Sequence, residues 1–62
     1  MTRDQIQRIV STYLVKEHED GGIETADIQQ CITDTAAECA VERDEVMRAL
    51  YTALEFGGAL NG

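Results

Sequence analysis

Apolar residues recur in three segments of the chain with the spacing of one face of an α-helix. The first segment has Ile6, Ile9, Val10, Tyr13 and Leu14 at the i, i+3, i+4, i+7 and i+8 positions of such a face. Thr2, with Gln5 three residues later, has the pattern of a capping box, in which the two side chains bind free backbone N–H groups. The pattern predicts a helix over residues 3–17, which ends before Gly21 and Gly22.

A second helix is predicted over residues 25–38. Its apolar face consists of Ile28, Cys31, Ile32, Thr35, Ala36 and Cys39. Thr25 is the expected N-cap, and Asp27 lies in the first turn, where the helix dipole favours negative charge. Weaker helix formers follow, so this helix ends either near Thr33 or near Glu38. Cysteines eight positions apart on a helix lie about 12 Å apart, too far for a disulfide, so free thiols are expected.

The third helix is predicted over residues 42–56, with an apolar face formed by Val46, Met47, Leu50, Tyr51 and Leu54. Acidic residues crowd its first turn, where the helix dipole stabilises them. Gly57 and Gly58 are expected to end the helix in the left-handed conformation, before a short extended tail at Ala59–Leu60. Three amphipathic helices predict an all-α fold, a compact three-helix bundle that forms one small domain over residues 1–62.

The composition is typical of a small folded domain with a large negative charge. Hydrophobic residues make up 44% of the chain and charged residues 27%, which is too apolar for disorder. No apolar run is long enough to span a membrane and the N-terminus has no signal-peptide core, so a cytoplasmic location is expected. The net charge of −7 opposes binding to nucleic acid and to anionic membranes. It favours either a basic partner or a high-salt cytoplasm.

The segment KEHEDGGIETAD resembles a calcium-binding loop in its spacing. An EF-hand loop needs oxygen ligands at positions 1, 3 and 5, a glycine at position 6 and an acid at position 12. When the first glycine takes position 6, Asp20 and Asp27 fit positions 5 and 12, but Lys16 and His18 fall at positions 1 and 3. A single His among loop carboxylates is also a weak zinc signal. The sequence therefore predicts no metal and no cofactor, and a helix end followed by a turn.

No residue pattern typical of an enzyme is present. The chain has one His and one Ser, and their spacing fits no nucleophile–base arrangement. Ser11 lies within the first predicted helix, outside the Asp-Ser-Leu motif that acyl carrier proteins need. The glycine pairs are isolated helix ends rather than a phosphate-binding loop. We therefore expect a non-enzymatic protein.

From Ile9 onward, the order of elements resembles a winged helix-turn-helix domain. A helix is followed by GGIETADIQQCI, a turn and VERDEVMRALYTALEFGGAL. Val41, Val46, Leu50, Leu54 and Gly58 match the spacing of the third helix of that family, and Ile23 matches its short extended residue before the second helix. The chain is most similar to the small C-terminal domains of minichromosome-maintenance helicases and of the middle subunit of replication protein A. The resemblance covers about fifty residues and implies a protein-interaction module.

Two departures separate the chain from the DNA-reading members of that family. The hairpin that forms the wing is missing or reduced to Ala59–Leu60. Glu42, Asp44 and Glu45 occupy the N-terminal turn of the presumed recognition helix, where DNA readers contact bases and phosphates. These carboxylates argue against nucleic-acid binding, and a plain helical bundle without a wing is the alternative fold.

The sequence thus predicts a small acidic helical domain that acts as a protein–protein interaction or regulatory module. Its partner is expected to be another protein with basic residues. The expected partner-binding residues are Glu24, Asp27, Glu42, Arg43, Glu45 and Arg48. One alternative is a helix-turn-helix regulator that binds nucleic acid. A second alternative is a homodimer that buries the remaining apolar side chains, such as Val15, Phe56 and Leu60.

Overall fold

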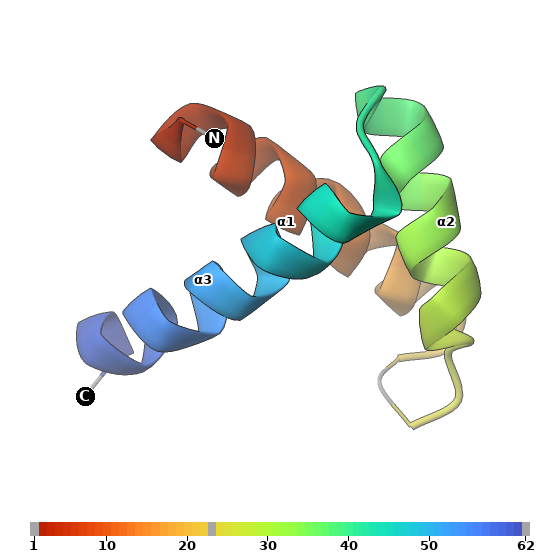
Figure 1. Ribbon diagram of the computed structural model, residues 1–62. Helices are drawn as coiled ribbons and strands as arrows, with labels where there is room; N and C mark the ends of the chain where they lie inside the picture. Colours follow the sequence, from red (N-terminus) through yellow and green to blue (C-terminus); the bar gives the residue numbers. More distant parts are fainter. Residues whose placement is uncertain (1, 23, 62) are drawn as a thin grey trace.

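Three α-helices form the fold (Figure 1). The computed structural model describes the backbone of residues 2–22 and 24–61 and the side chains of residues 2–22 and 24–55. Helix α1 spans Arg3–Glu19, α2 spans Ile28–Cys39 and α3 spans Arg43–Asn61. Each helix packs against the other two. The predicted all-α fold, a compact three-helix bundle, is therefore confirmed.

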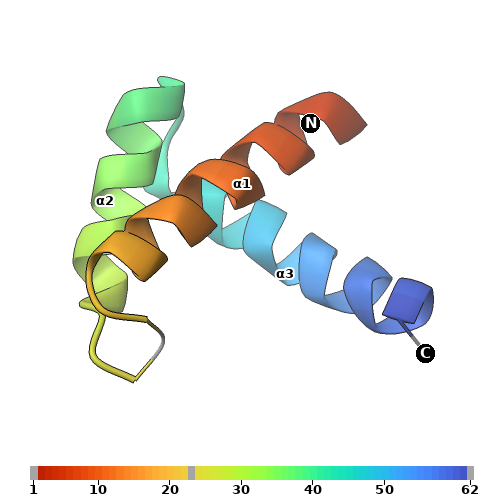
Figure 2. The ribbon, with the colours of Figure 1, turned by 180° about the vertical axis from the view of Figure 1, so that it is seen from behind.

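The helices cross one another, so parts of α1 and α3 extend beyond the bundle. In both views, the N-terminal half of α1 and the C-terminal half of α3 extend on the side away from α2 and diverge toward their ends (Figures 1 and 2). The connection between α1 and α2 lies at the opposite end of the molecule from the end of α3. The molecule is flat, with extents of 27 × 26 × 15 Å.

Helix α1 begins with the predicted capping box. The Gln5 backbone N–H donates to Thr2 Oγ1 at 3.1 Å, and the Thr2 backbone N–H donates to Gln5 Oε1 at 2.9 Å. Two backbone donors at the helix start are thereby satisfied, which stabilises the first turn. The helix runs to Glu19, two residues beyond the predicted end.

Asp27, not Thr25, is the N-cap of α2, so the predicted cap is wrong. The Asp27 carboxylate accepts from the Gln30 backbone N–H at 3.2 Å, and its charge is favoured by the helix dipole. Thr25 instead lies in the preceding turn, where its hydroxyl donates to the Asp20 carbonyl oxygen at 3.4 Å. The predicted extended residue Ile23 lies outside the described residues.

Asp20 closes the connection between α1 and α2. Its Oδ2 accepts from the Asp27 backbone N–H at 2.8 Å and so ties the end of α1 to the start of α2. Gly21 and Gly22 reverse the chain between them with φ values of 101° and 91°, which other residues rarely adopt. A Cβ on Gly21 would lie 2.3 Å from Thr25 Oγ1, so glycine is needed there for space as well.

Helix α2 continues to Cys39 without a break near Thr33 and ends in a Schellman motif. The Ala40 backbone N–H donates to the Ala37 carbonyl at 3.3 Å, and the Val41 N–H donates to the Ala36 carbonyl at 3.0 Å. Ala40 takes the left-handed position with φ 57° and ψ 45°, where glycine is usual. Val41 then packs against the core, and α3 begins two residues later.

The predicted end of the third helix at residue 56 is wrong. The backbone of α3 stays helical through Gly57 and Gly58 to Asn61, so Ala59–Leu60 is not an extended tail. Glycine permits the left-handed conformation but does not require it, and within a helix it costs only about 1 kcal/mol relative to alanine.

The core lies where the three helices meet. Its buried hydrophobic residues are Ile9, Tyr13, Cys31, Ile32, Ala36, Val46 and Ala49. Thr35 is also fully buried, and its hydroxyl donates to the Cys31 carbonyl at 2.7 Å, so its side chain is not left unpaired there. Both cysteines are free thiols, as predicted. None of the helices in the described residues is long and apolar enough to cross a membrane.

Only part of the predicted face of α3, Val46 and Leu50, lies in or against the core. Val46 and Ala49 are fully buried, while Leu50 and Ala53 are half-buried. The helix therefore packs through a narrow face in which Val46 and Ala49 are buried and Leu50 lies against the edge of the core. The larger residues on the adjacent face remain in solvent. Leu14 of α1, predicted to be buried, is also 53% exposed.

We expect Ala40→Gly to stabilise the fold, because Ala40 is exposed and held in the left-handed conformation. The gain should be about 1 kcal/mol, a rise in melting temperature of about 4–8 °C. Ala37→Gly is the matched control on the exposed surface of α2, and it should destabilise the fold by about 0.5–1 kcal/mol. Thermal unfolding of both variants tests this, and equal destabilisation would contradict the Schellman ending.

Candidate interaction surface

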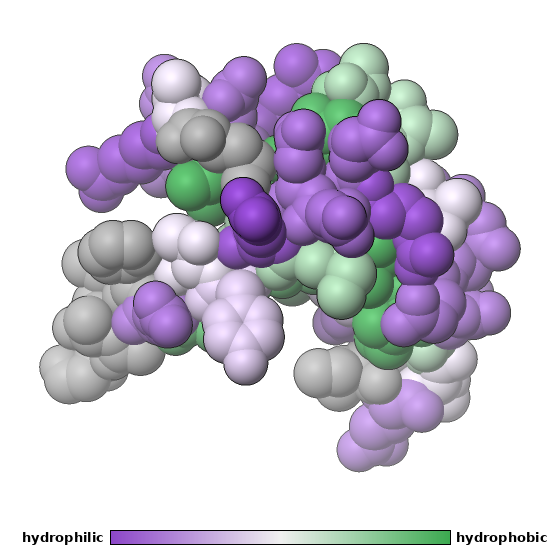
Figure 3. All heavy atoms as spheres, viewed as in Figure 1, coloured by the Kyte–Doolittle hydropathy of each residue, from purple (hydrophilic) through white to green (hydrophobic). Residues whose placement is uncertain are grey.

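Three large apolar side chains form an exposed row on α3, which we name the α3 stripe. Met47, Tyr51 and Leu54 occupy the i, i+4 and i+7 positions of one helix face. They are 50%, 72% and 75% exposed, respectively. Over α3, the space-filling view shows a band of apolar and weakly polar surface between strongly hydrophilic patches (Figure 3). No other part of the described structure covers this row.

A shallow groove lies beside the α3 stripe, where α1 and α3 diverge. It is lined by Ile6 of α1 and by Arg48, Tyr51, Thr52 and Glu55 of α3, and has a volume of about 480 Å³. It is open to solvent, so it suits a side chain from another molecule better than an enclosed substrate. Tyr51 belongs to both the stripe and the groove, which makes them one continuous surface.

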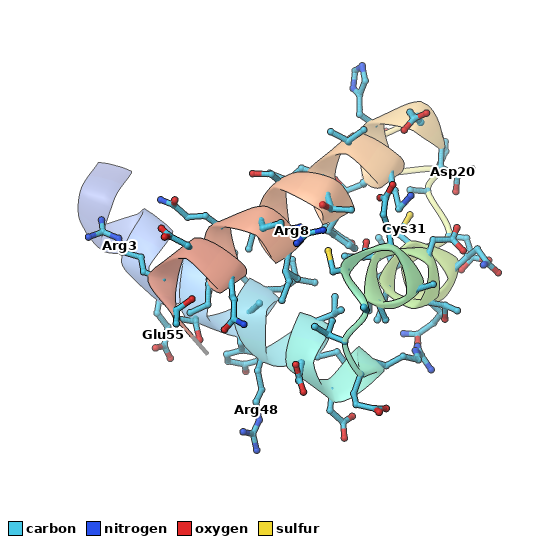
Figure 4. The ribbon with its side chains drawn as sticks, turned by 90° about the horizontal axis from the view of Figure 1, so that it is seen from above. Arg3, Arg8, Asp20, Cys31, Arg48 and Glu55 are labelled. Atoms are coloured by element: carbon cyan, nitrogen blue, oxygen red, sulfur yellow. The ribbon has the colours of Figure 1, made fainter. Side chains whose placement is uncertain are left out.

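Arg48 and Glu55 border this surface with opposite charges. They lie seven residues apart, so they leave the same side of α3 about two turns apart. Figure 4 shows Arg48 pointing away from α1 and α2, with Glu55 further along the same helix. Within the described part of the chain, neither side chain has an ion-pair partner. Both charges are therefore available to an approaching molecule.

The acidic residues are concentrated at the other end of the molecule. The segment 17–42 contains no Lys or Arg, and its carboxylates are Glu17, Glu19, Asp20, Glu24, Asp27, Asp34, Glu38 and Glu42. Lys16 Nζ pairs with Glu38 Oε2 at 3.1 Å across α1 and α2. The Glu38 carboxylate raises the pKa of Lys16 above its usual value. This end attracts basic groups and repels other acidic molecules.

The predicted partner-binding residues do not form one cluster. Glu24 is exposed in the turn before α2, while Asp27 serves as the cap of that helix. At the start of α3, Glu42 and Arg43 are exposed and Glu45 is half-buried. The Arg43 guanidinium donates to Gln29 Oε1 of α2. Arg48 lies apart from these residues, in the groove. Arg48 therefore adjoins the α3 stripe beside Tyr51, and Arg43 lies one turn before Met47 on the same face of α3.

The two acids that fitted the calcium-loop spacing have structural roles. Asp20 accepts from the Asp27 backbone, and Asp27 accepts from the Gln30 backbone. Among the described residues, no three His, Cys, Asp or Glu side chains group closely enough to hold a metal ion. The spacing of these acids therefore reflects the closure of the turn.

Tyr13 and Cys31 are buried ionisable groups in the core. Burial, and then the neighbouring Glu17 carboxylate, raise the pKa of Tyr13 from 10.0 to about 12. Burial also raises the pKa of the Cys31 thiol, with smaller contributions from nearby carboxylates that include Asp20. A raised pKa keeps Cys31 protonated and a poor nucleophile at neutral pH. Both groups therefore act as packing residues.

Helix periodicity did not predict the α3 stripe, because it favoured burial of the large apolar residues in the core. A second apolar row at the same spacing, Val46, Ala49, Leu50 and Ala53, was the available signal. Alanine contributes little to hydrophobicity, but it allows close helix contact. Val15, expected in a homodimer contact, is 58% exposed on α1, while the side chains of Phe56 and Leu60 lie outside the described ones.

No family model, curated protein or solved structure matches this chain, so its function is inferred from its own residues.

Raising the pH should destabilise the fold through Tyr13. Because the folded-state pKa of Tyr13 lies above the unfolded value, its contribution is fully present below pH 10 and is lost as the pH rises to about 12. The loss should be about 2 kcal/mol in the free energy of unfolding. Tyr13→Phe should lose less stability over this range than the unsubstituted chain. Tyr51→Phe is the control, and denaturant unfolding across the range measures all three; identical pH dependence would contradict the burial of Tyr13.

Proposed function

We propose that this chain is a protein–protein interaction module that contacts another protein through the α3 stripe. The observation that carries the proposal is the exposure of Met47, Tyr51 and Leu54 on one helix face. Burying a side chain of this size contributes about 1.5–3 kcal/mol, so leaving three in water is costly unless a partner covers them. Tyr, Met and Arg are also enriched in protein interfaces, and Arg48 borders the stripe.

The charges support a protein partner over nucleic acid. Glu42, Asp44 and Glu45 lie at the N-terminal turn of α3, the part that enters the DNA groove in helix-turn-helix readers. Phosphates would be repelled there, and the net charge of −7 adds to the repulsion at a distance. The two helices α2 and α3 with their short turn are compatible with a helix-turn-helix arrangement. The winged-helix domains that the sequence resembles would support the same binding role.

The acidic segment 17–42 provides a second and separate contact. Its carboxylates lack neighbouring Lys or Arg within the segment, so a protein with basic residues is the partner that this end favours. Glu24, Asp34 and Glu42 are exposed. The side-chain hydrogen bonds that close the turn and cap α2 come from Asp20 and Asp27 instead. Such a contact weakens as salt screens the charges, whereas the apolar contact of the α3 stripe persists.

Affinity capture with the purified chain should recover a protein that depends on the α3 stripe. Met47→Asp and Leu54→Asp place a charge in the apolar contact, so each should reduce capture at least tenfold. Val15→Asp is the matched control, because Val15 is similarly exposed but lies on α1 outside the stripe. Repeating the capture at about 0.5 M salt separates the two contacts, since only proteins held by the acidic end should be released.

Circular dichroism of each variant checks that the helices remain folded. Equal capture by the chain with Leu54→Asp and by the chain with Val15→Asp would contradict a contact through the stripe.

A further inference from the structure

We infer that the partner of the α3 stripe is a second copy of this chain, bound through antiparallel pairing of the two α3 helices about a two-fold axis. The inference rests on the proposed function, because it names the partner of the same surface. It commits to an isologous contact, in which each copy offers the same residues to the other.

The charges along the stripe are complementary to themselves only in the antiparallel direction. Arg48 and Glu55 lie on either side of Tyr51 along α3. A two-fold axis perpendicular to α3 and near Tyr51 therefore places Arg48 of one copy beside Glu55 of the second copy. The same axis places Glu55 of the first copy beside Arg48 of the second copy. A parallel pairing would place Arg48 and Glu55 of the two copies on opposite edges of the contact, so neither charge would meet an opposite one.

The apolar residues follow the same symmetry. Met47 and Leu54 also lie on either side of Tyr51, at similar distances along the helix. The same axis places Met47 against the second copy's Leu54, and the two Tyr51 side chains near each other at the centre. The half-buried side chain of Ile6, which lines the groove beside Tyr51, then extends the apolar contact onto α1. The aromatic residue thus occupies the centre of the contact, where binding energy is usually concentrated.

The fold leaves room for this approach. The C-terminal half of α3 extends away from α2, and the acidic connection between α1 and α2 lies at the opposite end of the molecule (Figures 1 and 2). Pairing through α3 therefore directs the two acidic ends away from each other. Beyond about 10 Å, salt screens most of the remaining repulsion. The net charge of −7 on each copy does not prevent this contact, although it would oppose pairing through the acidic segment.

The contact is small, so the dimer should be reversible. A stable interface buries about 800 Å² on each partner, whereas this contact relies on three large apolar side chains and one pair of charges from each copy. We therefore expect dissociation in the micromolar range or weaker.

Sedimentation equilibrium of the purified chain over about 10 μM to 1 mM tests the inference. The chain should move from monomer to dimer over this range, and Leu54→Asp should lower the association constant at least tenfold. Val15→Asp should leave it unchanged. A chain that stays monomeric at about 1 mM would overturn the inference, as would a dimer that Leu54→Asp leaves intact.

Charge exchange at Arg48 and Glu55 tests the antiparallel direction. Arg48→Glu places a carboxylate opposite the second copy's Glu55 and should weaken the dimer severalfold. Glu55→Arg should do the same, because it places a guanidinium opposite the second copy's Arg48. The double variant restores opposite charges and should dimerise nearly as well as the unsubstituted chain. An equimolar mixture of the two single variants should form a heterodimer.

Arg48→Glu and Glu55→Arg replace exposed side chains, so each variant should keep the circular dichroism spectrum of the unsubstituted chain. Failure of both the double variant and the mixture to restore the dimer would overturn the pairing.

These results also separate this inference from the proposed function. If the unsubstituted chain is monomeric at about 1 mM while Leu54→Asp still abolishes capture of a different protein, only the identity of the partner is wrong. If Leu54→Asp changes neither dimerisation nor capture, the stripe is not a contact surface and both fail.

Discussion

The rest of the structure depends on the packing of α3 through one narrow face, in which Val46 and Ala49 are buried. Val46 and Ala49 are fully buried where the three helices meet, and Leu50 packs against the same core. A chain of this length has little core volume, and it buries only about 60% of its unfolded surface. The bulk of this core comes from all three helices, with Ile9 and Tyr13 on α1, Ile32 on α2 and Val46 on α3. The larger side chains of α3 are consequently left on the outside.

Two turns hold the helices in this arrangement. The first uses Asp20 and Asp27 as acceptors for backbone N–H groups, with two glycines that reverse the chain between them. The second uses the left-handed Ala40 and the packing of Val41 against the core. Two acidic side chains of the first turn therefore stabilise the fold by accepting hydrogen bonds from the backbone. The charge that remains exposed between residues 17 and 42 is available for contacts with other molecules.

Helix periodicity and capping chemistry predicted much of the fold. The capping box at Thr2 and Gln5 and the buried residues of α2 follow from local sequence, because both depend on neighbours within one helix. The face of α3 could not be assigned this way, since the row that contains Val46 and Ala49 and the row that contains Met47 and Tyr51 have the same period. Which row is buried depends on how closely α1 and α2 approach, which is a property of the assembled bundle. For the same reason, Arg48 was predicted as a partner-binding residue, whereas Tyr51 was predicted on the apolar face of the third helix.

The α3 stripe and its bordering charges link this packing to the proposed function, because burying the face of Val46 and Ala49 leaves Met47, Tyr51 and Leu54 exposed to a partner. The most direct test is a dilution series of backbone amide chemical shifts measured by NMR. We predict concentration-dependent shifts in the segment 47–55 of α3 and at Ile6, with the outer face of α2 unchanged. Shifts confined to α2 and the acidic turn, or α3 resonances that stay constant up to about 1 mM, would contradict the account.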